Sequence, residues 1–129
     1  MITFRPPKRT GDISVDVARF LVQHGCATTA AHSRAVADMA DDLAARFGME
    51  REPAYTAAWL HDVSAVIPSA QRSEAAQQWH LTILPEEAAL PMILHQKLSA
   101  WMAQNLFAVR APDVLQAIRC HTTLRARAT

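Results

Sequence analysis

The chain has 129 residues, of which half are apolar and 19% are charged, and its formal net charge is +1. This length fits one domain, residues 1–129, and leaves little room for a second. The balanced charge argues against a broad surface for nucleic acid or for an anionic membrane. The longest apolar stretch, residues 88–94, is too short to span a bilayer, and no apolar segment follows the basic N-terminus. We therefore expect a cytoplasmic protein without a nucleic-acid or membrane partner.

An all-α fold is the first prediction from the residue pattern. Only three glycines occur, alanine is abundant, and apolar residues recur at intervals of three to four. The first helix is expected to begin at Asp12 or Ser14, either of which can cap it, and to stop at Gly25.

The second predicted helix has the clearest pattern. Thr28 or Thr29 can cap its start, and Gly48 can end it. Its apolar face is predicted from a helical spacing to comprise Val36, Met39, Ala40, Leu43 and Phe47. His32 lies four residues before Val36, so we expect it to point with this face toward the core.

The rest of the chain is divided by prolines. Pro53 suits the first turn of a third helix running from Ala54 to about Ala65, and Pro68 ends that helix. Further helices are expected over residues 69–79, 95–107 and 112–120.

Four segments at or near predicted helices carry residues that can hold a metal: His32, the pair His61-Asp62, His95 and His121. Imidazole with carboxylate suits divalent first-row metals, and helical bundles commonly hold such ligands on facing helices. Asp62 has two oxygens and can bridge two ions with histidines on either side. A single histidine is more often structural, as we expect for His24 and His80, but burying a histidine and a carboxylate together is costly unless something satisfies them.

Three residues near these histidines can contact a phosphate. Lys97 follows His95 by two positions, and Thr122 and Arg125 follow His121. Lysine and arginine both bind phosphate oxygens. The alternatives are a solvated basic tail and a threonine that only caps a helix end.

The order His, His-Asp, His, His-Thr resembles HD-domain proteins of the YqeK type over about residues 31–123. The most specific segments are AWLHDVSAVIP, LHQKLSA and VLQAIRCHTT. The resemblance implies an HD-domain helical bundle that binds a nucleotide. It also implies a metal-dependent phosphohydrolase that cleaves diadenosine tetraphosphate symmetrically to two ADP.

The same resemblance implies roles for individual residues. His32, His61 and Asp62 would hold one ion, and Asp62 would bridge to a second ion held by His95 and His121. His61 and Asp62 would be the catalytic residues, with Lys97, Thr122 and Arg125 binding substrate. Iron is the metal that the family favours, with manganese or zinc as alternatives, and relatives of this kind often form homodimers.

The chain also departs from the family pattern. Ala65 stands where a lysine is frequent, Leu124 stands where a glycine is usual, and a terminal aspartate on a later helix does not occur before Thr129. We therefore expect a domain that lacks the family's C-terminal helices. That loss would leave an apolar face for homodimerisation, lined by Trp101, Met102, Leu106, Leu115 and Ile118.

Two other functions stay open at this point. The first is an HD domain with impaired catalysis that serves as a nucleotide-binding or assembly module. The second is another HD enzyme, such as a nucleotidase. The Gly-Tyr-Pro triplet of cyclic-dinucleotide phosphodiesterases is absent from the sequence.

Overall fold

The computed structural model describes residues 1–86 and 91–119, with side chains from residue 94 onward in the second stretch. Within these ranges the chain forms α-helices and 3₁₀ turns and no strand, so the predicted all-α fold is confirmed. The elements are α1 (Ile13–Gln23), α2 (Ala27–Arg46), α3 (Arg51–Leu60), η1 (Val63–Val66), η2 (Ser69–Gln71), α4 (Arg72–Gln78) and α6 (Pro91–Leu106), and residues 112–119 are also helical. None of the helices in these ranges has the length and apolarity needed to cross a bilayer.

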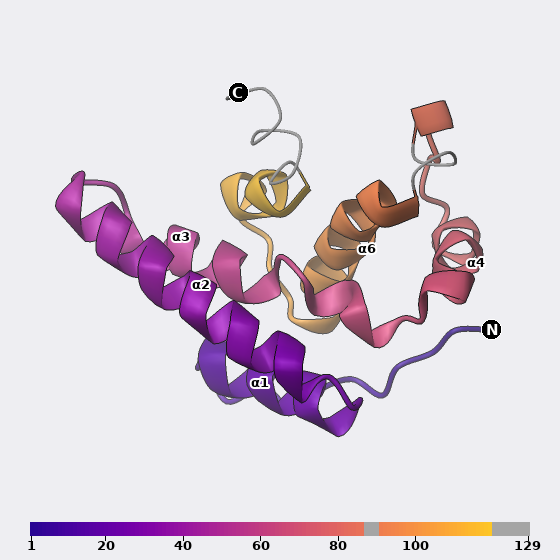
Figure 1. Ribbon diagram of the computed structural model, residues 1–129, viewed down its shortest axis with the longest axis horizontal. Coiled ribbons are helices and arrows are strands. Elements are labelled where there is room, and N and C mark those ends of the chain that lie inside the picture. The colour runs from indigo at the N-terminus through magenta and orange to yellow at the C-terminus, as the bar shows by residue number, and fades with distance from the viewer. Residues whose placement is uncertain (87–90, 120–129) are drawn as a thin grey trace.

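The elements lie in two groups on either side of the connection that follows α3 (Figure 1). Helix α2 packs along α3 and α1, whereas α6 packs against η1 and α4. The chain segment between α3 and α4 therefore touches both groups and is where residues from different helices can meet.

The predicted bounds of α1 are confirmed. Its N-cap is Asp12, whose Oδ1 accepts hydrogen bonds from the Ser14 backbone N–H at 3.0 Å and from the Ser14 hydroxyl. Just after the helix, Gly25 has a φ of +76°, a backbone conformation that glycine adopts without strain.

Helix α2 corrects two predictions. It begins at Ala27 with Cys26 as N-cap, so Thr28 and Thr29 lie inside the first turn and do not cap it. The predicted apolar face is only partly right, because just Val36 and Ala40 of its five residues are half-buried against the core. The buried side of α2 consists of Ala30, Ser33, Ala37 and Ala44, whereas Met39, Leu43 and Phe47 of the predicted face are exposed. Small side chains allow the backbones of α2 and α3 to approach closely, and this packing determines the buried side more than side-chain size does.

Helix α3 runs earlier than predicted, from Arg51 to Leu60 rather than from Ala54 to Ala65. Pro53 is tolerated because its position lies in the first turn, where a backbone N–H has no intrahelical acceptor. The helix ends before His61, and Val63–Val66 continue as a 3₁₀ turn. Ile67 is extended, as expected for the residue before Pro68. His61 and Asp62 therefore lie in the turn that ends α3 and not in a helix interior.

The core is continuous across both groups. Its largest fully buried side chains include Phe20, Leu21, Trp59, Leu60, Leu94, Leu98, Met102 and Ile118. Met102, Leu115 and Ile118 are buried within the chain, and Trp101 stacks on Trp79 with ring centroids 3.8 Å apart. The prediction that these side chains line an uncovered face is therefore wrong, and the homodimer stays a prediction without that surface.

Candidate metal centre

The turn after α3 fixes the orientation of His61. His61 is the C-cap of the helix, and its Nδ1 hydrogen-bonds the Ala58 carbonyl one turn earlier. A carbonyl oxygen only accepts, so Nδ1 carries the proton and donates. The other ring nitrogen, Nε2, faces Asp62, and once it carries no proton its lone pair can bind a metal.

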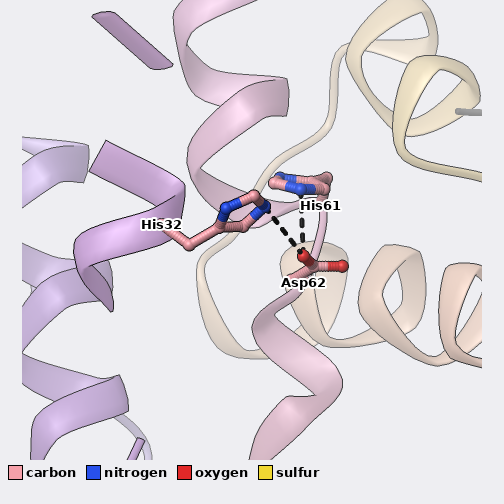
Figure 2. A group of neighbouring side chains, drawn as sticks. All are labelled: His32, His61 and Asp62. Atoms are coloured by element: carbon pink, nitrogen blue, oxygen red, sulfur yellow. Dashed lines mark ion pairs between the residues drawn. The ribbon is translucent and has the colours of Figure 1, made fainter. Parts of the chain in front are cut away.

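Three imidazoles surround the Asp62 carboxylate. The Nε2 atoms of His61 and His32 lie 3.0 Å and 3.7 Å from Asp62 Oδ2, and His95 Nε2 lies 3.3 Å from Oδ1. Figure 2 shows His32 and His61 both pointing toward the carboxylate, the first from α2 and the second from the end of α3. The prediction that these four residues belong together thus agrees with the geometry, although the His32 side chain is 59% exposed and does not point into the core.

Asp62 is a carboxylate with a stable negative charge. Burial raises its pKa, but hydrogen bonds from His61 and His95 and the charge of their rings outweigh burial and hold the pKa well below its ordinary value. Asp62 therefore stays ionised at neutral pH and can accept from a proton donor or bind a cation with either oxygen.

The donor set fits a divalent cation. One ligand atom each from His32, His61 and Asp62 lies within 4.8 Å of the other two. Around a single ion with bonds of about 2.0–2.2 Å, neighbouring ligand atoms stand roughly 3 to 3.6 Å apart. The observed separations of 3.0 and 3.7 Å are close to that range. Because His95 faces the other carboxylate oxygen, the arrangement also allows Asp62 to bridge two ions.

Two buried serines connect the segment after Asp62 to the helix that carries His95. The Ser64 backbone N–H donates to Ser99 Oγ (3.1 Å), the Ser99 hydroxyl donates to Ser64 Oγ (2.8 Å), and the Ser64 hydroxyl donates to the His95 carbonyl (3.0 Å). Neither serine is exposed to solvent. This network fixes η1 against α6 and so sets where His95 stands relative to Asp62.

A cavity of about 530 Å³ opens beside the centre, which is within the usual range for small-molecule sites. Its described lining residues are Thr28, Thr29, His32, Asp62, Ser64, Ala65, Arg72 and His95. Arg72, Ser64 and the two threonines were not predicted as site residues. Their signal was weak, because each is a common residue type without a metal-ligand spacing.

The remaining predicted site residues lie elsewhere or outside the described residues. Lys97 is two positions after His95 on α6, and two helical positions correspond to a rotation of about 200°, so the two side chains leave opposite sides of the helix. Accordingly, Lys97 lines a second cavity with Trp101 and Arg119, and its Nζ donates to the Thr82 carbonyl at 2.8 Å. His121, Thr122 and Arg125 lie outside the described residues, and their roles stay predictions.

The fold and the centre together define a helical domain that presents histidines and an aspartate from separate helices for a divalent metal. The HD domain family matches residues 29–128, and the chain belongs to this family. Divalent-metal binding is a property of HD domains. The chain is also 39% identical over 77 residues to an uncharacterized protein in the pepC 5' region of Lactococcus lactis subsp. cremoris. The aligned region is 60% of this chain and 40% of that relative. No solved structure matches the chain.

Proposed function

We propose that this chain is a metal-dependent phosphohydrolase that acts on a nucleotide phosphoanhydride, and that diadenosine tetraphosphate is its substrate. The observation that carries the proposal is the Asp62 carboxylate with imidazoles on both of its oxygens, at the wall of a cavity large enough for a ligand. Membership of the HD domain family, whose members are metal-dependent hydrolases, supports the same reaction class.

The chain's own residues supply binding and orientation for this reaction. His32, His61 and one oxygen of Asp62 would hold one ion, and His95 with the other oxygen would contribute to a second, together with His121. Bound divalent ions supply Lewis acidity for the phosphate and activate a water. The hydrogen bond from His61 to Ala58 keeps the ring fixed while substrate binds. In symmetric cleavage, water adds to an inner phosphorus, the central P–O–P bridge breaks, and two ADP leave.

The test combines metal analysis with product analysis. Purified chain, supplied with iron, manganese or zinc, is expected to retain about one to two ions and to convert diadenosine tetraphosphate to ADP alone. His61→Ala and Asp62→Asn should lose both the metal and the activity. His80→Asn is the matched control, because His80 lines the second cavity and has a φ of +58°, which asparagine tolerates. Formation of ATP and AMP would contradict symmetric cleavage.

One observation favours a second function. Ala65, which lines the cavity, stands where the family pattern often has a lysine. An HD domain of this kind could bind a nucleotide without cleaving it. Retention of metal with no hydrolysis of any dinucleoside polyphosphate, but with saturable nucleotide binding, would identify the chain as such a binding module.

A further inference from the structure

We propose that Arg72 binds a phosphate oxygen of the substrate in the cavity beside Asp62. This inference rests on the proposed function and extends it to the recognition of the anion. Among the described residues that line the cavity, Arg72 alone has a permanent positive charge. It reaches the cavity from the start of α4, whereas the metal-binding side chains come from α2, the end of α3, and α6.

The contacts of Arg72 leave its guanidinium ready for an anion. The Nε atom donates to the Ile67 carbonyl at 3.3 Å, which holds the half-buried side chain in place. Among the residues described, no carboxylate forms an ion pair with Arg72, and Asp62 in the same cavity is paired with imidazoles instead. The two amino groups at the end of the side chain can therefore form the paired hydrogen bonds that arginine makes to phosphate.

The charge of the cavity points to the same ligand. The Asp62 carboxylate and the Arg72 guanidinium sum to zero with neutral histidines, so one divalent ion brings the cavity to +2 and two ions bring it to +4. Arginine cannot act as a metal ligand because it does not lose its proton. A cation beside a metal centre, without a carboxylate partner, is stabilised by an anion that contacts both. The hydroxyls of Thr28 and Thr29 in the same wall can donate to further oxygens of that anion.

Three variants separate this role from metal binding. Arg72→Gln removes the charge, Arg72→Lys keeps the charge but loses the forked geometry, and Arg19→Gln removes an exposed arginine that lines a different cavity. Each protein is first checked for its circular dichroism spectrum and its metal content. Binding of inorganic phosphate is then measured by calorimetry on the metal-loaded and the metal-free chain, and KM and kcat are measured with diadenosine tetraphosphate.

The expected result is unchanged metal content in all three variants. Arg72→Gln should bind inorganic phosphate about tenfold to a hundredfold more weakly than the unmodified chain and should raise KM in proportion. Arg72→Lys should fall between the two, and Arg19→Gln should match the unmodified chain. Equal phosphate binding by Arg72→Gln and the unmodified chain, with a normal spectrum, overturns the inference. If the unmodified chain holds no metal, the proposed function fails. The metal-free titration then still decides whether Arg72 binds the anion.

Discussion

The contact between η1 and α6 depends on three hydrogen bonds that two buried serines make, and replacing Ser99 by alanine should break two of them. The Ser64 backbone N–H would lose its acceptor, and the Ser64 hydroxyl would lose its donor. A buried N–H without an acceptor costs about 1–3 kcal/mol, so Ser99→Ala should lower the free energy of unfolding by an amount in that range. Alanine fits the space that serine leaves, and steric strain should add little.

Ser64→Ala should behave differently. It removes the hydrogen bond to the His95 carbonyl and the acceptor of the Ser99 hydroxyl, but the backbone N–H at position 64 keeps its bond to Ser99 Oγ. We expect a loss of about 1–2 kcal/mol. Because both serines share one network, the double variant should lose less than the sum of the two single variants, with a coupling of about 0.5 kcal/mol or more.

Urea denaturation of the metal-free chain measures these differences. Ser73→Ala is the matched control, because Ser73 is an exposed serine on α4, where alanine is at least as favourable. Ser64→Ala should also weaken metal binding, since the Ser64 hydroxyl holds the backbone of His95, a proposed ligand. The reasoning is refuted if Ser99→Ala is as stable as Ser73→Ala, or if the two serine substitutions are strictly additive.

Three further predictions concern stability. Gly48→Ala should lower the free energy of unfolding by about 1–2 kcal/mol, because a φ of +67° strains any residue with a Cβ even though the space around it is open. Thermal denaturation should show a smaller loss of stability for Gly48→Asn. Leu98→Ala should cost about 2–5 kcal/mol, because the side chain is fully buried, and a urea midpoint close to that of the unmodified chain would contradict the described core. A hydrogen bond from Arg51 lowers the pKa of Asp41, so this pair stabilises the fold above the ordinary carboxyl pKa. The stabilisation is lost as the pH falls through the lowered pKa. Asp41→Asn should therefore slightly reduce the thermal midpoint at neutral pH but not at strongly acid pH.

The sequence predicted helix ends well where neighbouring residues determine the end of the helix. Asp12 caps α1 through its own side chain, and the glycines after α1 and α2 have positive φ. The prediction of the buried face of α2 failed because packing against another helix determines that face. The buried side of α2 consists of alanines and a serine that permit close approach to α3, while larger apolar residues such as Phe47 remain 74% exposed. A count of apolar residues at helical spacing favours large side chains, and it therefore indicated a face turned away from the buried one, with only Val36 and Ala40 half-buried against the core.

The sequence predicted several of the residues that meet at the candidate site, but not the other residues that line its cavity. His61, Asp62 and His95 were identified because histidine and aspartate are costly to bury together and are spaced over separate segments. Lys97 was selected for its nearness in sequence to His95, but a helix turns residues two apart to opposite sides. Arg72 is ten residues after Asp62, and only the turn and 3₁₀ segments between α3 and α4 bring it back to the same cavity.

The last prediction concerns how metal binding couples these elements. His32 belongs to α2, His61 and Asp62 to the turn after α3, and His95 to α6, so an ion held between them would connect three elements that the chain otherwise joins by packing and the serine network. Opening any one of these elements would then break a metal–ligand bond as well, and its backbone amides should exchange with solvent more slowly. Hydrogen exchange followed by mass spectrometry, with and without zinc, measures this. We expect slower exchange in η1, in the first half of α6 and around His32, and a much smaller change in α1, which supplies no ligand. Asp62→Asn should abolish the difference. Exchange that zinc leaves unchanged in all three ligand-bearing elements would refute the idea that the centre holds a metal between them.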